Sequence, residues 1–376
     1  MTHRERVFHA LRREPADRVP IFLWFHPDTA KRLASVLELP ESQLAVALGD
    51  DIRQTWVGNN HAMEGITHDR EGDTHTDDWG IRWVRSGPFN QILFSPLRDA
   101  DEDAVRRYAF PHGSIPSLVR NMEPLVEQAR GCFLGCDVSP SLFEMVCRIR
   151  GMEQAILDLA ENPGLAENLL EKAAVFGCRL AGEACQRYPL DWLWTGDDVA
   201  GQQNLMMNPS TWRALIAPRL ARVVGVGKSH GLPVAYHCCG AMREIIPDLI
   251  AMGIDVLNPI QCHCHGMDAR DLKREFGKYL TFMGGLDTIE LLPRGTPREV
   301  LRETRRLIGA MTEGGGGYIL AASHTVPPET PMENIFALYE AAGETKESIL
   351  DRAATLRGAP PLRGSPHADR KPGDTP

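Results

Sequence analysis

Short apolar runs alternate with longer amphipathic stretches along most of the chain. The apolar runs have the length of strands and lie at 132–136, 192–194, 233–237, 256–258, 280–283 and 318–321. Between them, apolar residues recur with a helical period at 208–229, 242–252, 269–276 and 296–309. Strands that alternate with helices indicate parallel strands joined by helical crossovers. About seven to eight such units fit the length, so the sequence predicts an α/β fold of the (β/α)8 TIM-barrel class.

The N-terminal segment adds one helix and one further strand to this pattern. Thr2 and Glu5 have the spacing of a capping box, and apolar residues follow them at helical spacing. Residues 18–24 then have the pattern of a strand. Neither a G-x-G-x-x-G nor a Walker A sequence occurs, which favours a barrel over an open nucleotide-binding sheet.

Two segments break the alternation. Residues 60–110 hold many acidic residues and short β-prone pieces, so we expect a β-rich insertion there, a β-hairpin lid. Residues 358–376 are rich in Pro, Gly and charge, a composition typical of a disordered tail. We therefore expect a single barrel domain over 1–357 that carries the insertion at about 60–110.

Composition narrows the class of function. The chain has 376 residues, with 41 Lys plus Arg, 50 Asp plus Glu and a net charge of −9. Nucleic-acid-binding proteins usually present a basic face, so nucleic acid is not an expected partner. No apolar run is long enough to predict a membrane span, and the charged N-terminus does not resemble a signal peptide. The nine cysteines are therefore expected to be reduced thiols of a cytoplasmic protein.

Metal-capable side chains follow several predicted strands, where a barrel carries its active site. His237 and Cys239 are two apart at the end of one strand, and His324 closes the last strand. Residues two apart on an extended chain face the same way, and imidazole and thiolate are zinc ligands. His237, Cys239 and His324 are thus candidate zinc ligands. The alternative is that His237 hydrogen-bonds at the barrel mouth while Cys238 and Cys239 both pack as small apolar groups.

Two other clusters compete for a chemical role. Asp197 and Asp198 follow the strand at 192–194, and we expect one to act as a general acid or ligand and the other to cap the following helix. The run at 262–265, Cys-His-Cys-His, is a second candidate metal site, because alternate members can pair on an extended segment. Its alternative reading is an exposed loop with incidental cysteines.

Several blocks of the sequence resemble one known family. They are T-H-R-E-R-V-F-H-A-L-R-R-E-P-A-D-R-V-P at 2–20, H-C-C-G-A-M-R-E-I-I-P-D-L-I-A-M-G-I-D-V-L-N-P-I-Q at 237–261, F-M-G-G-L-D-T at 282–288 and G-G-Y-I-L-A-A-S-H-T-V-P-P-E-T-P-M-E-N-I at 316–335. In this order they resemble the uroporphyrinogen decarboxylase superfamily. The resemblance covers nearly the whole chain except the tail, and it implies a (β/α)8 barrel with its site at the carboxyl ends of the strands.

The superfamily includes cofactor-free decarboxylases and corrinoid-dependent methyltransferases. Asp51 matches the decarboxylase aspartate that holds the pyrrole NH groups of the substrate. The arginines of the decarboxylases are missing from 24–29, however, and Met145 stands where they have a tyrosine. The methyltransferases have an H-x-C zinc pair where His237 and Cys239 stand. His324 takes the place of their later cysteine ligand, although the decarboxylases also have a histidine there.

The resemblance therefore favours a methyltransferase that moves a methyl group between a small methoxy, amine or thiol compound and a corrinoid carried by a partner protein. Zinc would assist, and a homodimer is one assembly that the resemblance implies. The expected catalytic residues are Asp197, Asp198 and Asp51, and the expected substrate-binding residues are Gln261, Asp287, Trp194 and Phe25. The alternatives are decarboxylation of a porphyrinogen or a smaller acid, centred on Asp51, and a silent protein that only binds a corrinoid or tetrapyrrole.

Overall fold

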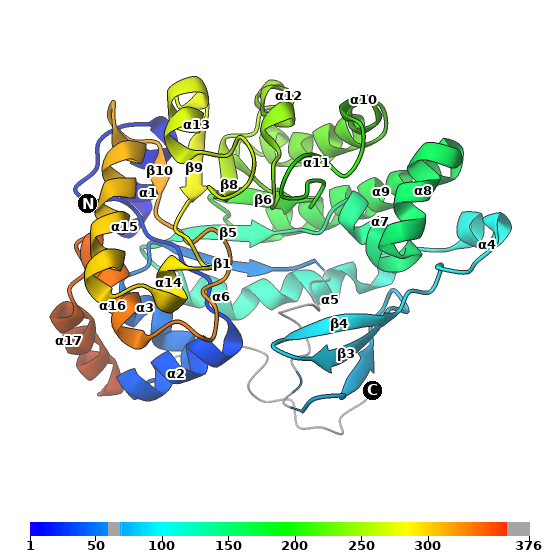
Figure 1. Cartoon of the computed structure of the whole chain (residues 1–376). Coiled ribbons are helices and arrows are strands. Elements are labelled where there is room, and N and C mark those ends of the chain that lie inside the picture. The colour runs from blue at the N-terminus through cyan, green and yellow to red at the C-terminus, as the bar shows by residue number, and fades with distance from the viewer. Residues whose placement is uncertain (59–67, 69, 359–376) are drawn as a thin grey trace. The chain divides into compact units, whose positions relative to one another are not determined.

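The chain divides into two compact units. The computed structural model describes residues 1–58, 68 and 70–358 (Figure 1). One unit comprises Met1–Arg53, Glu123–Leu134 and the residues from Asp255 onward, and the other comprises Gln54–Met122 and Gly135–Ile254. The strands β1 (Ile52–Trp56) and β5 (Phe133–Asp137) each begin in the first unit and continue into the second.

Parallel strands form the centre of the second unit. β5 pairs with β6 (Trp192–Gly196), and β6 pairs with β7 (Val234–His237), both in parallel. Every residue of β5 and β6 is buried, as continuous apolar strands of a parallel sheet require. The buried indole of Trp192 donates to Gln54 Oε1 at 2.7 Å. These three strands confirm the apolar runs at 132–136, 192–194 and 233–237.

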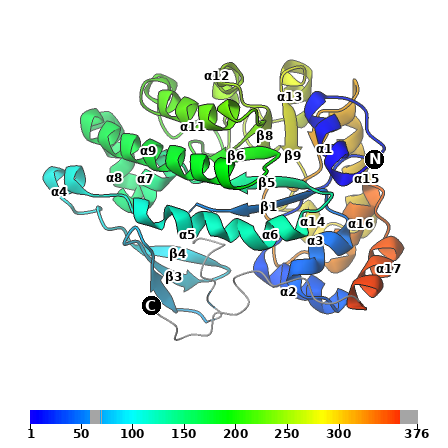
Figure 2. The same cartoon turned by 180° about the vertical axis from the view of Figure 1, so that it is seen from behind.

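Helices of the second unit connect and cover these strands. They are α4 (Glu102–Arg107), η2 (His112–Ser114), α5 (Ile115–Val119), η3 (Arg120–Met122), α7 (Phe143–Arg150), α8 (Met152–Glu161), α9 (Pro163–Arg187), α10 (Pro209–Thr211), the π-helical turn η4 (Trp212–Ile216), α11 (Ala217–Ser229), η5 (Arg243–Ile245) and α12 (Ile246–Met252). The long helices α9 and α11 pack side by side (Figure 2). Gly227 lets α11 approach β6 and β7 closely, since a Cβ there would lie 2.8 Å from Val234 and 3.2 Å from Leu193.

A small antiparallel sheet occupies part of the predicted insertion. β2 (Thr74–Thr76), β3 (Arg82–Ser86) and β4 (Phe89–Phe94) pair in the order β2-β3-β4. Asp77 organises the turn between β2 and β3, because its carboxylate accepts from the backbone of Trp79 and Ile81 and from the Trp83 indole. The expectation of a β-rich insertion is confirmed for this stretch. Most of 59–69 and the predicted tail beyond Gly358 lie outside the described residues.

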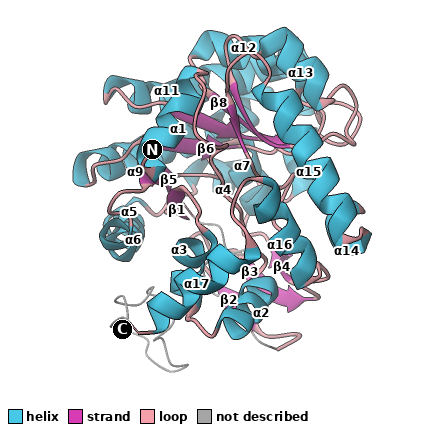
Figure 3. Ribbon diagram, turned by 90° about the vertical axis from the view of Figure 1, so that its left-hand side faces the viewer, coloured by secondary structure: helices cyan, strands magenta, loops and turns pink. Residues whose placement is uncertain are grey.

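The first unit repeats the alternation of parallel strands and helices. β8 (Val256–Ile260) pairs with β9 (Thr281–Gly284), and β9 pairs with β10 (Tyr318–Ile319). Its helices are α1 (His3–Arg12), α2 (Pro27–Leu37), η1 (Glu41–Gln43), α3 (Leu44–Leu48), α6 (Glu123–Gln128), α13 (Ala269–Phe276), α14 (Leu291–Arg294), α15 (Pro297–Thr312), α16 (Met332–Ala341) and α17 (Lys346–Arg357). α15 and α16 pack side by side (Figure 3). The capping box of Thr2 and Glu5 is present at the start of α1.

The predicted strand at 18–24 is wrong as a regular strand. The segment is extended, but Ile21 and Phe25 form only isolated parallel bridges, with Leu320 and Val326. Pro20 has no amide hydrogen to give to a ladder. The next amide, that of Ile21, donates to the Asp51 carboxylate at 2.8 Å instead of to a strand.

The described part of the chain contains no helix that is both long enough and apolar enough to cross a membrane.

Candidate metal site at the ends of two strands

The pairing of β6 with β7 brings together two of the polar clusters that the sequence singles out. Gly196, the last residue of β6, lies opposite His237, the last residue of β7. The amide of Asp197 continues this ladder and donates to the His237 carbonyl at 3.0 Å. Because the strands are parallel, the residues that follow them emerge at the same edge, and Asp198 therefore faces Cys239.

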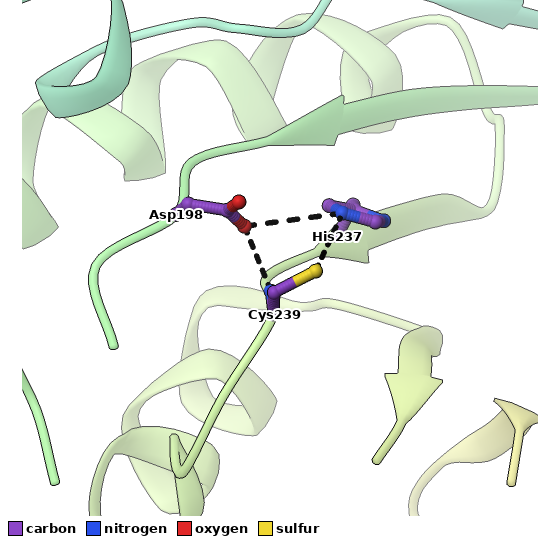
Figure 4. Close-up of side chains that lie close together, drawn as sticks. All are labelled: Asp198, His237 and Cys239. Atoms are coloured by element: carbon purple, nitrogen blue, oxygen red, sulfur yellow. Dashed lines mark hydrogen bonds and ion pairs between the residues drawn. The ribbon is translucent and has the colours of Figure 1, made fainter. Parts of the chain in front are cut away.

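Asp198, His237 and Cys239 form one cluster (Figure 4). Their ligand atoms all lie within 4.8 Å of one another. His237 Nε2 is 3.6 Å from Cys239 Sγ and 3.8 Å from Asp198 Oδ1. Asp198 Oδ1 also accepts from the Cys239 amide at 2.7 Å, which fixes the carboxylate against the strand end. The His237 and Asp198 side chains are 18% and 35% exposed, so a small molecule can reach them.

Two glycines make this approach of the backbones feasible. A Cβ on Gly196 would lie 2.9 Å from the His237 Cβ and 3.2 Å from the Ser139 Cβ. Gly240 has a φ of +95°, and a Cβ there would meet the carbonyl oxygens of Gly201 and Ala200 at 2.6 and 2.7 Å. Larger residues at either position would push the loops that carry the cluster apart.

The donor set and its spacing fit a zinc ion. Zinc takes histidine nitrogen, cysteine sulfur and carboxylate oxygen in a tetrahedron. Tetrahedral angles and normal zinc bond lengths place sulfur and nitrogen ligands about 3.6 Å apart, and nitrogen and oxygen ligands about 3.4 Å apart. The corresponding distances between Cys239, His237 and Asp198 are 3.6 and 3.8 Å. Three protein ligands leave one position of the tetrahedron for a substrate, as in catalytic zinc sites.

Asp197 points away from this cluster. Its buried carboxylate accepts from the amides of Phe143 at 3.0 Å and Glu144 at 2.7 Å, the first two residues of α7. Burial raises the pKa of Asp197 to about 8, with the two amide donors acting in the opposite direction. The two adjacent aspartates thus differ in environment, and Asp197 caps a helix that precedes it in the chain, not the following helix that the sequence analysis considers.

Two buried aromatic side chains, Trp194 and Tyr236, lie near the cluster. The fully buried Trp194 ring lies 6.4 Å from the His237 ring, with the two planes 35° apart. The buried Tyr236 hydroxyl donates to the Asp197 carbonyl at 3.2 Å. The full burial of Trp194 favours a structural role, and its predicted contact with substrate stays a prediction. Sequence reasoning missed Tyr236 and Gly196, because only the strand register shows what they touch.

Comparison with known proteins identifies the family. A family model described as uroporphyrinogen decarboxylase (URO-D) matches residues 127–345, more than half of the chain. The chain belongs to the URO-D family. The matched range includes the cluster of Asp198, His237 and Cys239, whereas Asp51 lies outside it.

Two curated relatives of this URO-D protein are methyltransferases from Methanosarcina mazei. The chain is 25% identical over 236 residues to a methylated-thiol–coenzyme M methyltransferase, a match that covers 62% of this chain and 59% of that protein. It is 21% identical over 354 residues to the methylcobamide:CoM methyltransferase MtbA, covering 91% of this chain and 97% of that protein. The chain thus spans about three fifths of the first relative and nearly all of the second.

A solved structure has the same fold. It is a methyltransferase from Methanosarcina mazei with a TM-score of 0.68 and 18% sequence identity, and the match covers 92% of this chain and 99% of that one. With the parallel β/α units described above, this similarity confirms the TIM-barrel-like α/β fold class predicted from the sequence.

Asp51, the residue on which a URO-D decarboxylase reading depends, is enclosed by donors. It directly precedes β1, at the amino end of a strand, which in TIM barrels is the stabilising face. Its fully buried carboxylate accepts from Arg6, Arg18, His3 and the Ile21 amide. Burial disfavours its ionised form, but the bonds from His3 and Arg18 outweigh that effect and lower its pKa. This geometry favours a structural role for Asp51, and its catalytic role stays a prediction.

The remaining predicted residues lie in the first unit. Gln261 follows β8 and donates to the Ser323 carbonyl at 3.2 Å. Asp287 follows β9, and its carboxylate accepts from three successive backbone amides that begin at Ile289. Phe25 forms one of the isolated bridges described above. These contacts hold loops in place, and substrate contact by Gln261, Asp287 and Phe25 stays a prediction.

His324 lies in the first unit, whereas Asp198, His237 and Cys239 lie in the second, so its role as a zinc ligand stays a prediction. It is an exposed residue of the loop that follows β10. In the described ranges, the third side chain beside His237 and Cys239 is Asp198, which the sequence analysis placed as an acid or an additional ligand. Asp198 lies beside His237 and Cys239 because β6 pairs with β7 in parallel. The sequence alone does not show this pairing.

The run at 262–265 forms a turn after β8. The Cys264 thiol is buried and lies 3.6 Å from Gln261 Oε1, while Cys262 is exposed. Across residues 1–58, 68 and 70–358, no group of three metal-capable side chains includes a member of this run. The geometry agrees with the reading of the run as a loop with incidental cysteines.

Proposed function

We propose that this URO-D family protein is a zinc-assisted methyltransferase that exchanges a methyl group between a small methylated compound and a corrinoid held by a partner protein. The observation that carries the proposal is the cluster of Asp198, His237 and Cys239 at the carboxyl ends of β6 and β7. Its place in the fold is that of a barrel active site. The methyltransferase relatives support the same class of reaction.

The three side chains would hold the zinc through His237 Nε2, Cys239 Sγ and Asp198 Oδ1. Bound zinc supplies Lewis acidity, which lowers the pKa of a coordinated thiol or stabilises negative charge on a leaving heteroatom. This chemistry suits substrates whose methyl group is attached to sulfur, oxygen or nitrogen. The methyl group would pass between this heteroatom and the corrinoid of the partner protein.

The protein's own groups orient and limit the reaction. The Cys239 amide holds one oxygen of Asp198 at 2.7 Å, so the carboxylate faces the ligand cluster before any ligand arrives. The buried Trp194 ring lies next to the His237 ring, with the ring centroids 6.4 Å apart. Asp198 and His237 remain partly exposed, so substrate approaches from the open side of the cluster. These contacts hold the Asp198 and His237 side chains in place, so they need to move less when zinc and substrate bind.

Decarboxylation on Asp51 is not favoured. A catalytic carboxylate must reach its substrate, and Asp51 is fully buried beneath two arginines, a histidine and a backbone amide.

The test is methyl transfer from methylcobalamin. Zinc-loaded protein is mixed with methylcobalamin and a panel of small thiols, phenols and amines, and loss of the methylcobalamin absorbance is followed together with the methylated product. We expect transfer to at least one acceptor by the wild type and by Cys238→Ala, but none by Cys239→Ala. Cys238 is the matched control, because it is adjacent in sequence but fully buried outside the cluster. Equal rates for wild type and Cys239→Ala, or no transfer to any acceptor, would overturn the proposal.

A further inference from the structure

Every polar group of Asp197 has a partner. Its two carboxylate oxygens accept from the Phe143 and Glu144 amides, at 3.0 and 2.7 Å. Its own amide donates to the His237 carbonyl at 3.0 Å, and its carbonyl accepts from the Tyr236 hydroxyl at 3.2 Å. The residue is fully buried. The backbone is therefore fixed on both sides immediately before Asp198.

The α7 helix depends on this contact. Its N-cap residue, Leu142, supplies no side-chain hydrogen bond, so the carboxylate of Asp197 takes the place of a local cap. Every residue of α7 except Glu144 is buried, and Arg150 pairs with the buried Asp158. The helix is thus firmly packed, and the hydrogen bonds of Asp197 connect the end of β6 to its first turn.

We infer that Asp197 is a positioning residue: by tying the end of β6 to the first turn of α7, it sets where Asp198 enters the metal-ligand cluster. The inference rests on the proposed metal-dependent function. Asp198 needs such support because its side chain is 35% exposed, and its hydrogen bond from the Cys239 amide comes from within the cluster itself. An exposed carboxylate whose backbone moved would leave the pair of His237 and Cys239 without its third ligand.

The test uses Asp197→Asn, which keeps the size of the side chain but turns an amide group toward one of the two helix amides. Cobalt(II) is bound in place of zinc, because its visible absorption reports ligand number and its near-ultraviolet band reports the thiolate. Metal affinity is measured by competition with a chelator. We expect affinity to fall by about 10- to 100-fold, as for other supports of metal ligands. The visible bands should change, while the thiolate band from Cys239 persists.

A double-mutant comparison separates positioning from general loosening. Because Asp197 acts through Asp198, Asp197→Asn should weaken cobalt binding much less in an Asp198→Ala background than in the wild type. Tyr236→Phe, a milder change to the same anchor, should shift affinity in the same direction by a smaller factor. Asp268→Asn is the matched control, since Asp268 also accepts from two amides at the start of a helix, α13, and is not in the cluster.

The outcomes are distinct. Wild-type affinity and spectrum in both Asp197→Asn and Tyr236→Phe would overturn the inference while leaving the proposed function intact. Equal factors in the wild-type and Asp198→Ala backgrounds would also overturn it, because the effect would then bypass Asp198. A wild-type protein that binds no cobalt would overturn the proposed function and this inference together.

Discussion

Replacing Asp51 by Asn should destabilise the protein without altering its metal site. The Asp51 carboxylate accepts from Arg18 at 2.7 Å, from His3 at 2.8 Å and from the Ile21 amide at 2.8 Å, and Arg6 contacts it as well. An asparagine of the same size would remove the charge and turn an NH2 group toward some of these donors. These hydrogen bonds connect α1, the extended segment after it and the start of β1. Losing them would weaken the packing between these three segments.

The size of the effect follows from the burial of the pairs. Removing one partner of a buried ion pair typically costs about 3–5 kcal/mol. Arg6 retains bonds to Asp17, and Arg18 retains Glu344 at 3.1 Å, so neither cation is left alone. We therefore expect a loss near the lower limit, about 3 kcal/mol.

The contribution of Asp51 to the free energy of unfolding should decrease at low pH. The pKa of Asp51 is lower in the folded protein than in the unfolded chain, where it is about 3.9. The stabilisation is therefore fully present above about pH 4 and is lost as the pH falls through the folded pKa. The difference between wild type and Asp51→Asn should be constant from pH 5 to 8 and shrink below pH 4.

Urea unfolding followed by circular dichroism at several pH values measures both quantities. Asp17→Asn is the control, because Asp17 shares Arg6 with Asp51 but its side chain is 44% exposed, and it should cost less than about 1 kcal/mol. A loss below 1 kcal/mol in Asp51→Asn, or abolished methyl transfer in a variant of unchanged stability, would refute the structural role of Asp51.

Two further predictions concern other buried groups. Burial raises the pKa of Asp50 to about 7, so the folded state retains a proton there and stability should fall as the pH rises from about 4 to 7. In Asp50→Asn, the side chain can still accept from Tyr339, but it no longer titrates. The change in unfolding free energy between pH 4 and 7, measured by urea unfolding, should therefore be smaller than in the wild type by about 2–4 kcal/mol. An unchanged pH profile would contradict this reading. Gly196→Ala should displace His237, since the new Cβ would lie 2.9 Å from the His237 Cβ. Zinc affinity by chelator competition should then fall by at least about tenfold, whereas Gly182→Ala, where a Cβ meets nothing within 4 Å, should leave it unchanged.

Local sequence was sufficient for most of the fold. The helix at 269–276 has the predicted bounds, because an Asp268 cap and a strong apolar face specify it locally. The strands β5 to β10 are short, mostly apolar and almost entirely buried, which is the pattern of a parallel sheet. β1 was missed, because Arg53 and Gln54 interrupt its apolar pattern. Gln54 Oε1 accepts from the indole of the distant Trp192, and Arg53 donates to the nearby Asp50 carbonyl.

The candidate site was only partly predictable. The two-residue spacing of His237 and Cys239 predicts that both side chains lie on one face, and His237 Nε2 indeed lies 3.6 Å from Cys239 Sγ. Assigning the third member required the register of β6 against β7, which depends on packing along the whole strand pair. The donors around Asp51 lie 30 to 48 residues away in the chain, so its structural role was equally hidden from local patterns.

Zinc content is the most direct test of the proposed metal site. Protein produced with ample zinc is dialysed against metal-free buffer, and metal per chain is determined by elemental analysis for wild type, Cys239→Ala and Cys238→Ala. The cluster of Asp198, His237 and Cys239 predicts about one zinc per chain in the wild type and in Cys238→Ala, and almost none in Cys239→Ala. Wild-type protein without zinc, or zinc retained in full by Cys239→Ala, would contradict the account.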